Sequence, residues 1–200
     1  MSQKSTTCAV AATMLFGGTL GAAHAGVTGV AGNSSSASLS LAYVSDPYVN
    51  ARADGSPMNG AVSFSDPTYG WISCSQFTSS GFALTIGSTA AANQQNFFVQ
   101  QNFIVTGTVQ FSLTGFLPVS SAGSALIEQN GTLIASSGSN AGNFSLTGTL
   151  QAGEYRFAYT SAATGATNGT LFNLTFSEVP APGALALLGA AGLVAGRRRR

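Results

Sequence analysis

Charged residues are scarce in this chain: only 6% of its 200 residues are Asp, Glu, Lys or Arg. Lys4 is its one lysine and His24 its one histidine, so residues 26–200 contain neither type. Without histidine, that stretch lacks Ser-His-Asp and Cys-His catalytic groups and every metal site that needs a histidine ligand. Without lysine, it lacks Schiff-base chemistry and the lysine of phosphate-binding loops. A pair of carboxylates is the catalytic option that remains, and such a pair suffices for glycoside hydrolysis.

The central region is acidic, although the whole chain has a formal charge of +1. Between Gly26 and Glu178, two basic residues stand against six acidic ones, which leaves a net charge of −4. Because nucleic-acid binding needs a basic patch, we expect no nucleic-acid partner. Abundant Ser, Thr, Asn and Gln must keep the surface hydrated, and these groups also hydrogen-bond to polysaccharide or to further copies of the chain. The charged residues are Arg52, Arg156, Asp46, Asp54, Asp66, Glu128, Glu154 and Glu178.

Cysteine is nearly absent. Cys74 is the only cysteine outside the N-terminal segment, so no disulfide can form within the central region. We expect Cys74 to be a small buried apolar residue on a strand. The alternative is a bridge to a second chain in an oxidising compartment. Under the first interpretation, the stability of the domain comes from the packing of its sheets.

The N-terminus has the pattern of an export signal. A basic residue, Lys4, precedes the apolar stretch 8–22, and Ala23-His24-Ala25 follows as a small-residue cleavage motif. This order predicts a signal peptide over residues 1–25 that signal peptidase removes, so that the mature chain begins at Gly26. An uncleaved membrane helix is the alternative, but the apolar run is short and rich in Gly and Thr.

The C-terminal segment 178–200 holds a short apolar run closed by arginines. The 14 residues from Gly183 to Gly196 carry no charge, and as a helix they would extend about 21 Å, against a hydrocarbon core of about 30 Å. The following arginines favour the cytoplasmic side of a membrane. The segment therefore predicts a short transmembrane helix over 184–196 that serves as a temporary anchor.

This tail resembles the PEP-CTERM sorting signals of Gram-negative bacteria, in a Val-Pro-x-Pro-Gly variant. The matching positions are Val179, Pro180, Pro182 and Gly183, then the apolar helix, then Arg197, Arg198, Arg199 and Arg200. Ala181 stands where the family's Pro-Glu-Pro form has glutamate. The resemblance implies processing by an exosortase after transient anchoring in the inner membrane. It also implies a final place at the cell surface or outside the cell, beside exopolysaccharide or biofilm. It covers about a tenth of the chain.

Residues 26–177 predict one all-β domain. Short stretches of alternating apolar and polar residues recur between turn signals, and no stretch before the tail has a helical period. About ten such strands favour an antiparallel β-sandwich of the jelly-roll or Ig-like kind. The clearest hairpin lies at residues 125–135, where Asn130-Gly131 favours a type I′ turn. Residues 97–117 form the longest β-rich region, with Gly107 as a bend or bulge.

One alternating strand carries both a predicted core face and a predicted ion pair. Tyr155, Phe157 and Tyr159 recur at period two and are expected to be buried. Glu154 and Arg156 lie two residues apart on the opposite face, where they could pair with each other, and such a pair would add little stability at a surface.

Two groups of residues are candidates for a binding site. Asp46, Asp54 and Asp66 lie in a turn-rich region, where they are either weak calcium ligands or turn formers that precede Pro and Gly. Tyr69 and Trp71 flank Gly70 at a strand entrance, where their rings either stack on a sugar or belong to the core.

The expected function is therefore that of an exported, non-catalytic cell-surface or matrix protein associated with exopolysaccharide. We expect no cofactor. The main alternative is a carbohydrate-binding module that uses the Tyr69 and Trp71 rings. A less favoured alternative is a polysaccharide hydrolase, which requires two carboxylates about 5–10 Å apart in a cleft.

Overall fold

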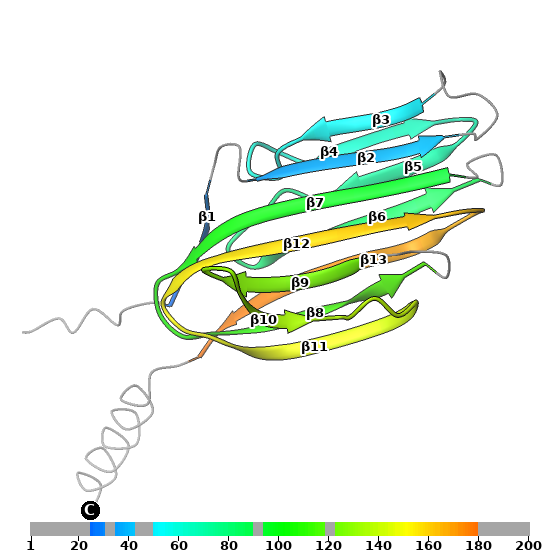
Figure 1. Ribbon diagram of the computed structural model, residues 1–200. Coiled ribbons are helices and arrows are strands. Elements are labelled where there is room, and N and C mark those ends of the chain that lie inside the picture. The colour runs from blue at the N-terminus through cyan, green and yellow to red at the C-terminus, as the bar shows by residue number, and fades with distance from the viewer. Residues whose placement is uncertain (1–24, 31–34, 43–49, 90–93, 119–122, 180–200) are drawn as a thin grey trace, which may run out of the picture.

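The computed structural model describes residues 25–30, 35–42, 50–89, 94–118 and 123–179 (Figure 1). These residues form thirteen strands and no helix, so the predicted all-β class is confirmed. The strands make two antiparallel sheets, a seven-stranded sheet A and a six-stranded sheet B. Side chains of both sheets fill the space between them, as expected of a sandwich.

Sheet A runs in the order β10 (Thr132–Ser136), β9 (Ser124–Gln129), β12 (Gly153–Ala163), β7 (Gln94–Val105), β2 (Ser36–Ala42) and β3 (Asn50–Gly55). The short β1 (Val27–Gly29) pairs with the end of β7. Sheet B runs in the order β11 (Gly142–Leu150), β8 (Val109–Leu117), β13 (Asn168–Glu178), β6 (Gly81–Ser88), β5 (Gly70–Cys74) and β4 (Val62–Asp66).

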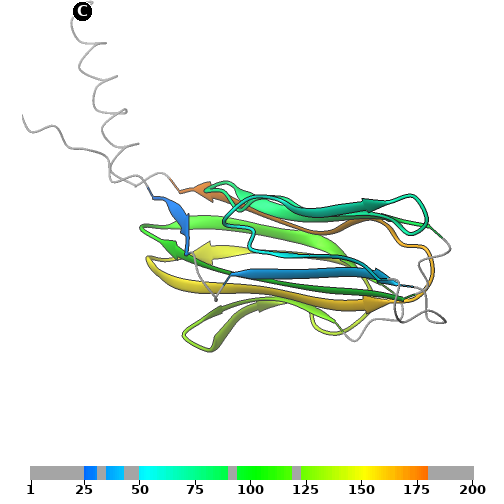
Figure 2. The ribbon, with the colours of Figure 1, turned by 90° about the horizontal axis from the view of Figure 1, so that it is seen from above.

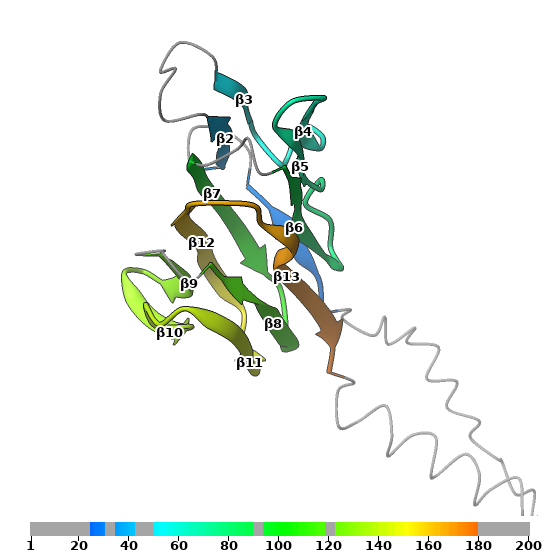
Figure 3. The ribbon, with the colours of Figure 1, turned by 90° about the vertical axis from the view of Figure 1, so that its right-hand side faces the viewer.

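The chain crosses between the two sheets seven times. The crossings follow β3, β6, β7, β8, β10, β11 and β12. As a result, β3 and β4 lie together at one edge of the sandwich, and β10 and β11 lie together at the other (Figure 3). Among the described strands, each edge strand has a neighbour on one side only, so its outer backbone groups make no ladder with a second strand of this part of the chain.

The alternation of apolar residues decides which side of each strand is buried. In β7, every second side chain from Gln95 to Val105 points into the sandwich and is buried. Both sheets contribute fully buried side chains, among them Leu39 and Phe157 from sheet A and Leu84 from sheet B. Burial of this apolar area is the main favourable term in folding.

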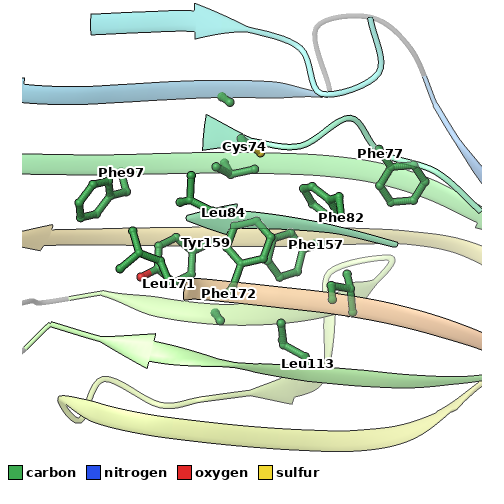
Figure 4. Packing of buried hydrophobic residues seen from close by; sticks show 14 of the residues in the cluster. Cys74, Phe77, Phe82, Leu84, Phe97, Leu113, Phe157, Tyr159, Leu171 and Phe172 are labelled. Atoms are coloured by element: carbon green, nitrogen blue, oxygen red, sulfur yellow. The ribbon is translucent and has the colours of Figure 1, made fainter. Parts of the chain in front are cut away.

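Aromatic rings join the two sheets at the centre of the core (Figure 4). The ring of Phe172 on β13 lies 4.8 Å from that of Phe157 and 5.2 Å from that of Tyr159, both on β12. It also lies 5.1 Å from the ring of Phe82 on β6. The predicted burial of Tyr155, Phe157 and Tyr159 is confirmed, with exposures of 5%, 0% and 0%.

The predicted hairpin is present between β9 and β10. Asn130 and Gly131 have positive φ angles of 50° and 77°, as a type I′ turn requires. The register shifts between Leu133 and Ala135, which places a β-bulge in β10. The turn signal therefore predicted the connection but not the irregular pairing that follows it.

The β-rich region 97–117 is divided between the sheets. β7 belongs to sheet A and β8 to sheet B, and Gly107 lies in the turn between them rather than in a bulge of one strand. Apolar alternation continues through this turn because both strands bury their inner faces in the same core. The apolar alternation therefore does not indicate that the chain passes from sheet A to sheet B here.

Candidate functional site

The two ends of the described domain are bound to the same loop. The backbone N–H of Gly26 donates to Thr106 Oγ1 over 3.0 Å, and that of Val179 donates to the carbonyl of Thr108 over 3.2 Å. Residues 106–108 connect β7 to β8, so the chain enters and leaves at one end of the sandwich (Figure 2). The half-buried Ala25 packs here too, since a Cβ on Gly107 would lie 2.8 Å from its Cβ.

The remaining signal residues lie outside the described residues. These are Ala23, the predicted membrane helix 184–196, Pro180, Pro182, Gly183 and the four arginines Arg197 to Arg200. Within the described ranges, no helix has the length and apolar character to span a membrane. The sorting signal and the cleaved leader therefore stay predictions.

The two aromatic residues of the proposed sugar platform do not lie on one surface. Tyr69 is buried, with 8% of its surface exposed, whereas Trp71 is 45% exposed. Gly70 separates them with a φ of 107°, a conformation that breaks the alternation of a regular strand. A Cβ at Gly70 would stand 2.1 Å from the carbonyl oxygen of Gly87, so only glycine fits there. Of the pair, Trp71 alone offers a ring to solvent.

Trp71 lies against β6 on the outer face of sheet B. It is opposite Gly87 of β6 in register, and a Cβ at Gly87 would lie 2.4 Å from the indole Nε1 and 2.7 Å from Cε2. The indole therefore occupies the space that a side chain at position 87 would need, and 45% of Trp71 remains exposed. On the other neighbouring strand, β4, Ser65 is the register partner of Trp71. An exposed indole among hydroxyl groups suits the apolar face of a sugar ring.

The aspartates take part in local interactions. Asp54 accepts from Arg52 Nε at 2.5 Å and from Nη2 at 3.0 Å, and this guanidinium lowers the pKa of the Asp54 carboxyl. Asp66 Oδ1 accepts from the backbone N–H groups of Thr68 at 2.7 Å and Tyr69 at 3.0 Å, which makes it a turn former. Asp46 lies outside the described residues. Among those that are described, no three His, Cys, Asp or Glu side chains gather around a common point.

The predicted pairing of Glu154 with Arg156 is wrong. Arg156 donates from Nε to Glu128 Oε2 at 3.0 Å, and its Nη2 contacts the same oxygen. The register of β9 and β12 places Arg156 directly opposite Glu128. The two residues are 28 positions apart in the sequence, so no local signal could identify the pair.

An open groove of about 370 Å³ surrounds this ion pair on the outer face of sheet A. Glu128 and Glu154 both line it, together with Arg156 and Asn102. The groove thus has two carboxylates in its lining, and one of them, Glu128, is held in an ion pair by the guanidinium of Arg156.

Hydroxyl and amide groups cover part of the outer face of sheet B in three rows across β11, β8 and β13. The rows are Thr149–Gln110–Ser177, Thr147–Ser112–Thr175 and Ser145–Thr114–Asn173. A second open groove, of about 350 Å³, lies over the first two rows. None of the described residues that line this groove is charged. The surface can therefore make many hydrogen bonds without selecting a ligand by its charge.

Cys74 is fully buried and unpaired on β5, as predicted. Burial raises the pKa of its thiol to about 12. The reactive thiolate is therefore almost absent at neutral pH, and the sulfur cannot reach a second chain. This burial argues against the intermolecular bridge.

The chain matches no protein-family model and no curated protein sequence.

Proposed function

We propose that this chain is an exported, non-catalytic surface or matrix protein that works beside secreted polysaccharide. The observation that carries the proposal is the outer face of sheet B, where three strands present rows of hydroxyl and amide groups without a charge. Such a face exchanges hydrogen bonds with sugar hydroxyls, and it is insensitive to the charge of the polymer. The leader and the PEP-CTERM-like tail supply the route out of the cell.

We infer a jelly-roll arrangement for the sandwich. The support is the order of the last eight strands: β6–β13–β8–β11 in sheet B lies against β7–β12–β9–β10 in sheet A. This order fits two Greek keys wound between the sheets. The first five strands extend both sheets on the side of β6 and β7.

The shared position of Gly26 and Val179 suits a domain held at one end. While the tail is in the inner membrane, the loop 106–108 faces that membrane. Ser80, beside the start of β6, accepts from the N–H of Phe176 and therefore lies near this end. Gly87, under Trp71, is seven residues further along than Ser80, which corresponds to about 23 Å of strand. Trp71 therefore lies toward the far end of the domain, where a polymer has free access.

The first prediction concerns the two signals. In the producing cell, the mature protein is expected to begin at Gly26, to end near Pro180, and to be found outside the inner membrane. Intact-mass measurement of cell fractions checks this. Removing Arg197–Arg200 is the matched change. This variant is expected to stay uncut and to be found in a different cell fraction from the mature protein. A full-length species that stays in the inner membrane would contradict exosortase processing and indicate a plain tail anchor.

The second prediction tests the carbohydrate-binding alternative, which the placement of Trp71 on Gly87 favours. Trp71→Ala is expected to weaken binding to the producer's purified exopolysaccharide about tenfold or more, because a buried aromatic contact contributes at least ~1.4 kcal/mol. Affinity electrophoresis of the full chain measures this. Phe98→Ala is the matched control, since Phe98 is 38% exposed on sheet A. Equal binding by both variants and the parent chain excludes Trp71 as the contact.

The hydrolase alternative rests on Glu128 and Glu154 in the groove of sheet A. The same polysaccharide tests it, because hydrolysis releases new reducing ends. Their steady release by the parent chain, and its loss in Glu154→Gln, would overturn the non-catalytic proposal.

A further inference from the structure

The two edges of the sandwich differ in charge. At the edge formed by β3 and β4 stand three charged residues, Arg52, Asp54 and Asp66. At the other edge, the continuous described stretch 132–150, which includes β10 and β11, has neither a charge nor a proline. Charges on an edge strand discourage pairing with another chain, and their absence leaves the edge open to it.

β11 is the regular strand of this open edge. Its nine residues pair with β8 without a register shift, whereas β10 has a bulge. Among the described strands, none lies on its other side. The side chain of Phe144 leans over its own sheet, since a Cβ on Gly115 would lie 2.6 Å from the tip of the Phe144 ring. The Phe144 ring therefore does not cover the outer backbone edge of β11.

Apolar side chains beside this edge are incompletely buried. Phe144 and Leu146 of β11 are only partly buried. Leu133 and Ile134 of β10 are 57% and 41% exposed, and they account for two of the four large exposed hydrophobic residues in the described part of the chain. Both strands lie at the same edge (Figure 3). A partner that continues sheet B here would shield this apolar surface as well.

We propose that β11 pairs antiparallel with β11 of a second copy, around a two-fold axis at Leu146. In this register the inner-face positions Phe144, Leu146 and Gly148 stand opposite Gly148, Leu146 and Phe144 of the other copy, so no polar side chain meets an apolar one. On the outer face, Ser145 stands opposite Thr147, and Asn143 opposite Thr149, which pairs polar groups with polar groups. The strand is thus self-complementary, as a two-fold interface requires. The result is a dimer with one continuous twelve-stranded sheet built from two copies of sheet B.

Charge substitutions on the exposed face of β11 test both the dimer and its register. Ser145→Lys with Thr147→Lys places like charges directly opposite each other at two points of the joint. The full chain with both changes is expected to sediment as a monomer, whereas the parent chain sediments at twice the monomer mass. Ser145→Lys with Thr147→Glu instead places opposite charges at the same points and should restore the dimer.

Ser63→Lys with Ser65→Lys is the matched control, because it adds the same charges to exposed positions of β4, at the other edge of sheet B. All variants are compared by sedimentation velocity in one detergent buffer, so the C-terminal segment contributes equally to each. A dimeric control supports the proposal. A monomeric parent chain at high concentration overturns it, as does a Lys/Lys variant that stays dimeric. A Lys/Glu variant that stays monomeric overturns the register centred on Leu146.

Discussion

Replacing Phe172 by alanine is expected to lower the free energy of unfolding by about 3–5 kcal/mol. Phe172 is fully buried and contacts the rings of Phe82, Phe157 and Tyr159 within 5.2 Å. Removing its ring leaves a cavity between the sheets and breaks contacts with strands of both of them. Single domains are stable by about 5–15 kcal/mol. The substitution therefore removes a large part of the total stability.

Urea denaturation of the full chain, followed by tryptophan fluorescence, measures this effect. Phe98→Ala is a suitable control because Phe98 is 38% exposed and contacts no other ring among the described residues. We expect its cost to be below ~1 kcal/mol. If both variants lose the same stability, the ring cluster around Phe172 is not what joins the sheets.

Gly81→Ala is expected to cost about 3–5 kcal/mol, more than any other glycine-to-alanine change proposed for this chain. Gly81 has a φ of 125°, which L residues rarely adopt. A Cβ there would also lie 1.9 Å from the carbonyl oxygen of Leu174 on β13. Since β6 and β13 are inner strands of sheet B, neither can move away without breaking its other pairings.

Gly169→Ala separates the two causes. Gly169 has a φ of 127°, close to the 125° of Gly81, but a Cβ there would meet nothing within 4 Å. Its substitution should cost only the backbone strain, about 1–3 kcal/mol. Comparing the two urea midpoints then gives the contribution of the clash with Leu174. Equal costs would mean that sheet B relaxes around the added methyl group.

The local pattern of the sequence determined the strands and their buried sides. Period-two alternation predicted the inward side chains of Tyr155, Phe157 and Tyr159, and Asn130-Gly131 predicted its hairpin. These features depend on residues within a few positions of one another, since side-chain direction and turn geometry are local properties of the backbone. The scarcity of charge likewise excluded whole classes of site before any contact was known.

Only the tertiary structure decided which strands are neighbours. Both sheets bury their inner faces in one core, so the alternation is the same in each and does not record the change of sheet at Gly107. Strand pairing placed Glu128 opposite Arg156, and it brought both Gly26 and Val179 into hydrogen-bond contact with the loop 106–108. It also laid Trp71 on Gly87 while Tyr69 turned inward. Each of these outcomes depends on non-local pairing, which the energy of the whole packed core selects.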